Sequence, residues 1–140
     1  MAETIKLQFN IDGNNFADAG AASGKVKKTL TQLGFEPAVI RRAAIAMYEG
    51  EINMVIHADG GVADVYIDSD KIRIVLSDKG PGIADVELAM KEGYSTASQE
   101  ARDLGFGAGM GLPNMKNYTD EMTVNSKVGV GTTVEMIINC

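Results

Sequence analysis

The fold of this 140-residue chain is constrained most strongly by four segments in which apolar and polar residues alternate. These segments form two pairs, and a short turn joins the members of each pair. The alternation of apolar and polar residues predicts strands over residues 62–68 and 72–77, and again over residues 121–126 and 132–138. Strands that follow one another through short turns form antiparallel hairpins. A doubly wound fold alternates strand and helix strictly, so this order excludes it.

The rest of the chain supplies one more strand and several helices. Residues 4–11 alternate as a strand with one buried face. Gly34 suits the end of a helix and Pro37 the first turn of the next. Helices are expected over residues 16–33, 37–57, 85–92 and 112–118. The sequence therefore predicts one α+β domain over residues 1–140, a two-layer sandwich in which helices cover one face of a mixed, mostly antiparallel sheet.

Composition narrows the class of protein. The chain is 45% hydrophobic and has no apolar run of membrane-spanning length, and its N-terminus lacks the basic start and apolar block of a signal peptide, so a cytoplasmic location is expected. The net charge of −6 disfavours a nucleic-acid surface, and a single cysteine and a single histidine disfavour a zinc site. An acidic protein binds a nucleotide mainly through backbone N–H groups and a metal, and the sixteen glycines fit that requirement.

Glu49 and Asn53 are the first candidate functional pair. Residues four apart on a helix lie one turn above each other, and these two share a sector of roughly 100° with Ile45, Ile52 and Ile56. This places two polar groups within or beside a buried stripe. A carboxylate can deprotonate a hydroxyl, and an amide oxygen can coordinate Mg²⁺. Such a pair alone is more often a solvated helix surface.

The residue between the members of this pair is a glycine. Gly50 costs about 1 kcal/mol relative to alanine inside a helix. We therefore expect Gly50 to loosen the position of Glu49.

Three glycine-rich segments follow in a fixed order. Asp78 lies an even number of positions after the apolar residues of the preceding strand, so its side chain is expected on the same, apolar face of that strand. A turn rich in glycine and proline follows Asp78. Glycines over residues 105–111 precede a helix, whose N-terminus favours phosphate. The run Gly129-x-Gly131-Thr132-Thr133 precedes the last strand. Each segment alone is as well explained as a turn or a flexible loop.

The order and spacing of these motifs resemble the GHKL ATPase superfamily, whose Bergerat fold is shared by DNA gyrase and histidine-kinase catalytic domains. Within it the chain looks most like the small anti-sigma-factor serine kinases and the related switch kinases of bacterial stress signalling. The subgroup is indicated by EGYST at residues 92–96, GMGLP at 109–113 and NSKVGVGTTV at 125–134. The resemblance begins at about residue 37.

The resemblance implies ATP and Mg²⁺ as cofactors. Asn53 would bind Mg²⁺, Glu49 would be the general base, and Asp78 would accept a hydrogen bond from the exocyclic amine of adenine. Further nucleotide contacts are implied for Gly80, Gly82, Gly107, Gly109, Met110, Gly111, and Thr132 or Thr133. The loop before residue 105 is longer than in compact members of the subgroup, and its Arg102 is suited equally to a phosphate contact and to an exposed surface.

The leading hypothesis is a cytoplasmic, Mg²⁺-dependent protein serine/threonine kinase of the anti-sigma or switch type. Its substrate would be a small antagonist or scaffold protein, with a sigma factor as a further partner, and neither nucleic acid nor membrane is expected. The competing hypothesis is a non-catalytic module in which ATP only sets a binding surface. A separate histidine-kinase catalytic subunit matches the loop and C-terminal motifs less well. The sequence does not determine the oligomeric state, and a homodimer is compatible with it.

Overall fold

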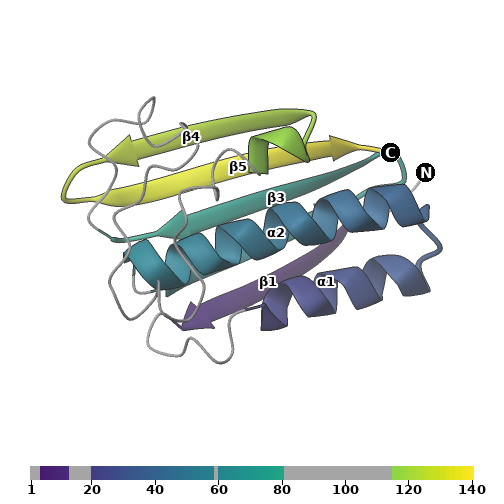
Figure 1. Ribbon diagram of the computed structural model, residues 1–140, viewed down its shortest axis with the longest axis horizontal. Coiled ribbons are helices and arrows are strands. Elements are labelled where there is room, and N and C mark those ends of the chain that lie inside the picture. The colour runs from purple at the N-terminus through teal and green to yellow at the C-terminus, as the bar shows by residue number, and fades with distance from the viewer. Residues whose placement is uncertain (1–3, 13–19, 59, 81–114) are drawn as a thin grey trace.

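In the computed structural model, a five-stranded sheet is covered on one face by two helices (Figure 1). The structure describes residues 4–12, 20–58, 60–80 and 115–140. The strands are β1 (Ile5–Asp12), β2 (Gly60–Ile67), β3 (Lys71–Asp78), β4 (Glu121–Lys127) and β5 (Gly131–Asn139), and the helices are α1 (Ala21–Gln32) and α2 (Pro37–Ala58). The helix expected over residues 85–92 lies outside the described residues, and the last one is described only as a helical turn over residues 115–117.

The strand order is β1-β2-β3-β5-β4, and the four described pairings are all antiparallel. Both predicted hairpins, β2–β3 and β4–β5, are confirmed. The sheet, expected to be mixed and mostly antiparallel, is antiparallel in every described pairing, since β1 runs against β2 and β3 runs against β5. The β3–β5 pairing sets Asp78 opposite Thr132.

Local sequence explains where the helices end and begin. Gly34 has a φ of +82°, and the N–H groups of Gly34 and Phe35 donate to the carbonyls of Thr31 and Leu30, both at 3.2 Å. This paired arrangement is the Schellman motif, which confirms Gly34 as the residue that stops α1. Pro37 is the first residue of α2, as its missing N–H favours.

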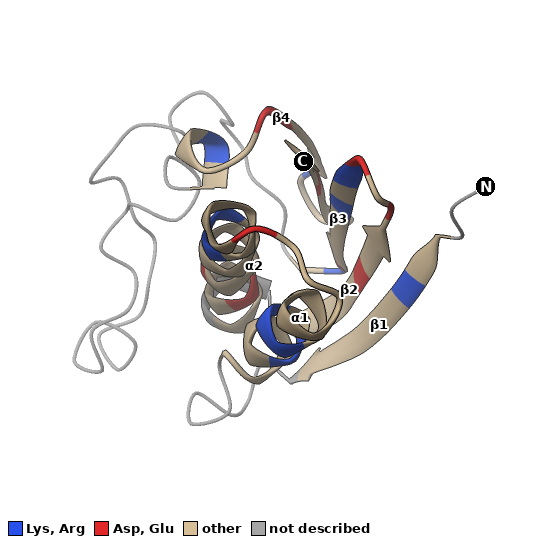
Figure 2. Cartoon of the chain, turned by 90° about the vertical axis from the view of Figure 1, so that its right-hand side faces the viewer, with Lys and Arg blue, Asp and Glu red and all other residues tan. Residues whose placement is uncertain are grey.

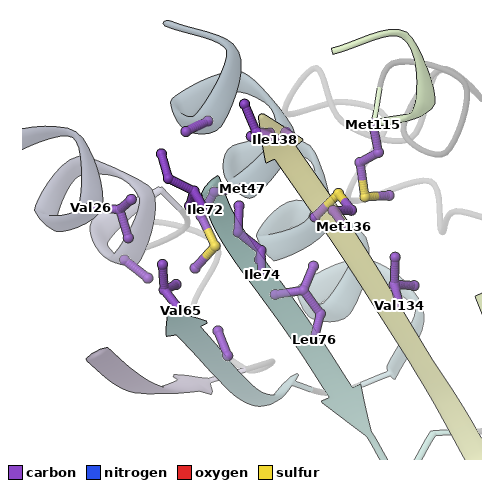
Figure 3. Close-up of a cluster of buried hydrophobic side chains, with 14 of the residues drawn as sticks. Val26, Met47, Val65, Ile72, Ile74, Leu76, Met115, Val134, Met136 and Ile138 are labelled. Carbon is purple, nitrogen blue, oxygen red and sulfur yellow. The ribbon is translucent and has the colours of Figure 1, made fainter. Parts of the chain in front are cut away.

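The core lies between α2 and the sheet (Figure 3). Met47 of α2 and the strand residues Ile74 and Met136 are fully buried there. A Cβ atom at Gly50 would overlap Leu76 Cδ1 and lie 3.3 Å from Met115 Sδ. The missing side chain lets the α2 backbone pack closely against Leu76 of β3, which gives Gly50 a packing role.

The buried stripe of α2 differs from the predicted one. It includes Ala43, Met47 and Met54, whereas Glu49 and Asn53 are half-buried at its border. The two polar residues flank the stripe because the helix turns its small and flexible apolar residues to the sheet. No described helix combines the length and the apolar character that crossing a membrane requires.

One ion pair ties α2 to the far strands. Arg42 Nη2 lies 2.9 Å from Asp120 Oδ2, and Arg42 Nε donates to the Tyr118 carbonyl at 3.2 Å. The same Asp120 oxygen accepts the N–H of Asn139 at 2.7 Å. The Asn139 N–H, followed by the Arg42 guanidinium, lowers the pKa of Asp120 below the usual aspartate value.

Candidate functional site

Asp78 ends β3 on the helix-covered face of the sheet. Its Oδ1 accepts the backbone N–H groups of Gly80 at 2.9 Å and of Thr132 at 3.2 Å. Both described hydrogen bonds use Oδ1 and neither uses Oδ2. The carboxylate is therefore held in one orientation by its first oxygen, and its second oxygen is suited to accept from an amine.

The structure separates the two threonines that the sequence left as alternatives. Thr132 is 8% exposed and shares the buried face of β5 with Val134 and Met136. Thr133 is one residue further, so its side chain belongs to the opposite face of the sheet, and it pairs with Ser77. The fold brings Thr132 to Asp78 and does not bring Thr133 there.

Ser126 is a further site residue, which the sequence analysis did not single out. Its Oγ lies 2.8 Å from Thr132 Oγ1, and the two residues are partners in the β4–β5 register. The register of the β4–β5 hairpin could have identified this residue. Because Lys127 pairs with Gly131 across the turn, Ser126 must pair with Thr132. A carboxylate and two hydroxyls thus meet at one end of the sheet.

Gly131 makes this meeting possible. Its φ is +144°, and a Cβ atom there would overlap the Asp78 carbonyl oxygen and lie 3.0 Å from the carbonyl carbon. Gly129, with a φ of +79°, occupies the turn in which the N–H of Val130 donates to the Lys127 carbonyl at 3.0 Å. The two glycines therefore serve the turn and the close approach of β5 to β3.

Glu49 and Asn53 lie on the half of α2 that is nearest to the Asp78 end of β3. Gly50 packs on Leu76, and a Cβ atom at Gly61, which follows α2, would lie 3.1 Å from Asp78 Cα. The helix therefore runs toward the Asp78 end of the sheet. The predicted pair and the predicted aspartate come from different layers of the fold and lie toward the same end of it.

Glu51, two residues after Glu49, has a structural role that sequence reasoning missed. Its side chain is 2% exposed, and its carboxylate oxygens accept the N–H groups of Ala22 at 3.2 Å and Ser23 at 3.1 Å. Helix α1 begins after Gly20, which has a φ of +101° and no side chain to cap the helix. Glu51 caps the start of α1 from the neighbouring helix, where the dipole favours a negative charge.

Several predicted positions lie outside the described residues. They are Gly82, Arg102, Gly107, Gly109, Met110 and Gly111. Among the predicted glycines, Gly80 is described, and its N–H holds Asp78. The described part of the predicted site is therefore Glu49, Asn53, Asp78, Gly80 and the two threonines.

A divalent cation is compatible with the described donors. No group of three or more histidine, cysteine or acidic side chains in the described segments is arranged to hold a metal. Mg²⁺ bound with phosphates needs only one or two protein ligands, because phosphate oxygens and waters complete its shell. The amide oxygen of Asn53 is a donor of the kind that Mg²⁺ prefers.

Comparison with known proteins adds independent information. The family described as histidine kinase-, DNA gyrase B-, and HSP90-like ATPase matches residues 38–139. Serine/threonine-protein kinase RsbT of Bacillus subtilis (strain 168) is 31% identical over 124 residues, which cover 86% of this chain and 87% of that protein. Anti-sigma F factor of Anoxybacillus flavithermus is 30% identical over 145 residues, covering 98% and 92% of the two chains.

A solved structure supports the fold. The structure of RsbU and RsbW domains from Mycobacterium tuberculosis has a TM-score of 0.65 and 16% identity to this chain. The match covers 96% of this chain and 32% of the other. At this level of identity it is evidence about the architecture alone.

Proposed function

Because the chain belongs to the family of histidine kinase-, DNA gyrase B-, and HSP90-like ATPases, we propose that it is a cytoplasmic, ATP-binding regulatory kinase. It would transfer the γ-phosphate of ATP to a serine or threonine of a small antagonist or scaffold protein, and a sigma factor would be a second partner. The names of two relatives, a serine/threonine-protein kinase and an anti-sigma factor, support this choice within the family.

The observation that carries the proposal is the orientation of Asp78. Its Oδ1 is held by two backbone N–H groups, so Oδ2 would accept the exocyclic amine of adenine. A fixed acceptor discriminates against bases that lack the donor, since the acceptor would then be left unpaired. The hydroxyls of Thr132 and Ser126, 2.8 Å apart, would hold the adenine side beside it.

Asn53 and Glu49 would act on the phosphate side. The Asn53 amide oxygen would hold Mg²⁺, which supplies charge neutralisation on the phosphates when bound. Glu49 would orient the acceptor hydroxyl and take its proton as the hydroxyl oxygen bonds to the γ-phosphorus and the bond to ADP breaks. Gly107, Gly109, Met110 and Gly111 remain the proposed backbone contacts to the phosphates, with Gly80 and Gly82 beside the base.

Two variants test the assignment. Glu49→Gln keeps the shape of the side chain and removes its basicity, so ATP affinity should stay within about twofold while phosphotransfer falls by about 10²–10⁴-fold. Asn53→Ala should abolish the Mg²⁺-dependent part of ATP binding. ATP affinity is measured by calorimetry with and without Mg²⁺, and phosphotransfer with labelled ATP and the proteins encoded by neighbouring genes.

The outcomes separate the competing functions. If the wild-type chain labels none of these proteins while ATP still changes its affinity for one of them, the kinase assignment fails and the non-catalytic module replaces it. If Asn53→Ala binds ATP and Mg²⁺ as the wild type does, the site assignment itself is wrong.

A further inference from the structure

A groove of about 290 Å³ lies between α1 and α2, and the proposed base Glu49 forms part of its wall. Gly24 leaves open space on the α1 side, and Ile45 and Tyr48 of α2 form much of the other side. Sites for drug-sized ligands start at about 300 Å³. At about this size the groove suits a few side chains of a peptide.

The two ends of the groove differ in charge. The first turn of α1 lies beside the later part of α2, because Ser23 bonds to Glu51 and the space above Gly20 is closed by Tyr48. The next turn of α1, with Lys27, consequently lies toward the earlier part of α2. Glu49 stands at one end of the groove and Lys27 at the other, with apolar walls between them.

The surface around the groove is basic. Lys25, Lys27 and Lys28 are exposed on α1, which carries no acidic residue (Figure 2), although the whole chain has a net charge of −6. The nearest acidic side chain of α2 after Glu49, that of Glu51, is buried and already binds two backbone N–H groups. Charge complementarity therefore favours an acidic occupant at the Lys27 end.

We propose that this groove binds the acceptor segment of the protein substrate, with its serine or threonine at Glu49 and an aspartate or glutamate at Lys27. Lys27 lies one helical turn beyond Ser23, about 6 Å along the axis. An extended chain covers that length in about two residues. The inference rests on the proposed function, since it takes the acceptor to be a protein hydroxyl that Glu49 activates.

Gly24 gives a sharp test, because a Cβ atom there meets nothing within 4 Å. Gly24→Leu should fill the groove without disturbing the packing, and Gly24→Ala is the matched control that adds only a methyl group. The probe is a seven-residue peptide with a central serine and an aspartate two residues to either side, added to the isotope-labelled full chain. Amide shifts at residues 24, 27 and 45 should move in the wild type and in Gly24→Ala, and affinity should fall at least tenfold in Gly24→Leu.

Charge reversal tests the other end. Lys27→Glu should weaken binding of the aspartate peptide and favour a peptide with lysines in the same places, whereas Lys25→Glu, on the same helix outside the groove lining, should change the preference far less. Peptide affinity that is equal in all four variants, shifts confined to other parts of the chain, or no shifts at all would overturn the proposal.

ATP affinity measured on the same variants separates the two levels of inference. Gly24→Leu and Lys27→Glu should bind ATP as the wild type does. If ATP binds normally and the groove takes no peptide, this inference fails and the proposed function stands. If the wild type binds no ATP, the proposed function fails first.

Discussion

Asp78 Oδ1 accepts the backbone N–H of Thr132 at 3.2 Å, a bond between residues 54 positions apart in the chain. It joins the end of β3 to the start of β5 on the face that the helices cover. The same oxygen accepts the N–H of Gly80, so two backbone groups fix the direction of the second carboxylate oxygen. Adenine recognition, as proposed above, depends on that direction.

Asp78→Asn should separate the structural role from the binding role. The amide oxygen can still accept both N–H groups, whereas an NH₂ donor replaces Oδ2 and would face the amine of adenine. We expect the midpoint of thermal unfolding to change little and ATP affinity to fall about 10- to 100-fold, the value of a hydrogen bond to a charged group. Calorimetric titration with ATP measures the loss.

Asp64→Asn is the matched control for this prediction. Asp64 lies on the face of β2 opposite to α1 and α2, where it accepts from Gln8 Nε2 at 2.8 Å. An equal loss of ATP affinity in both variants would show that overall charge is responsible, and an unchanged affinity in Asp78→Asn would remove Asp78 from the site.

Gly50→Ala should destabilise the fold although alanine is the better helix former. The new methyl group would overlap Leu76, and overpacking of this kind costs about 1–3 kcal/mol. Gly24→Ala, where the space is open, should instead stabilise by about 0.5–1 kcal/mol. Urea unfolding measures both. Adding Leu76→Val, which removes the overlapping Cδ1, should restore part of the loss, and no restoration would contradict this explanation.

Glu51→Ala should loosen the first turn of α1. Two backbone N–H groups would lose their acceptor, each at a cost of about 1–3 kcal/mol where water cannot replace it. Amide hydrogen exchange at Ala22 and Ser23 should accelerate, together with a lower free energy of unfolding. Glu49→Gln, two residues away, should leave this exchange nearly unchanged. Equal exchange in Glu51→Ala and wild type would show that Glu51 is not the cap.

Asp120 should contribute to stability at neutral pH and not in acid. Its pKa in the folded chain is lowered by the N–H of Asn139 and by Arg42, so folding favours the ionised form. That contribution is complete above the usual aspartate pKa and is lost as the pH falls through the lower folded value. The difference in free energy of unfolding between the wild type and Asp120→Asn should therefore become smaller as the pH is lowered. We expect a gap below about 1 kcal/mol, since the pair is partly exposed.

Urea unfolding at pH 7 and pH 3 measures this gap. Glu121→Gln removes a neighbouring acidic group and serves as the control. A gap that is the same at both pH values would contradict the assignment of the pKa shift to the folded state.

Patterns within short windows predicted most of the fold. Alternation located the strands, and Gly34 and Pro37 marked a helix end and a helix start, because these signals depend on the backbone of a few residues. The parity of Asp78 correctly placed a carboxylate at the end of an apolar strand face. The same alternation would have favoured Thr132 over Thr133, since Thr132, Val134 and Met136 are alternate residues of β5 and face the same side.

Features that depend on distant partners were missed. The role of Glu51 is set by backbone groups 28 and 29 residues earlier, and the only local hint is that α1 begins after a glycine without a capping side chain. Helix propensity marked Gly50 as a weakness because it takes no account of Leu76 in the opposite layer. Helical periodicity also could not show which side of the buried stripe on α2 would face α1.

The sheet order has a consequence for how the chain folds. β1, β2 and β3 lie on one side of the β3–β5 pairing and the β4–β5 hairpin on the other, so the two halves of the sheet join along that seam. Closing a loop of 54 residues costs about 3–4 kcal/mol of chain entropy, which must be lost before the contacts between β3 and β5 form. Joining the halves, like pairing β1 with β2 across a loop of similar length, should therefore slow folding. A ligand held at Asp78 would bind only after the seam has closed, and would lengthen the lifetime of the folded chain by opposing its reopening.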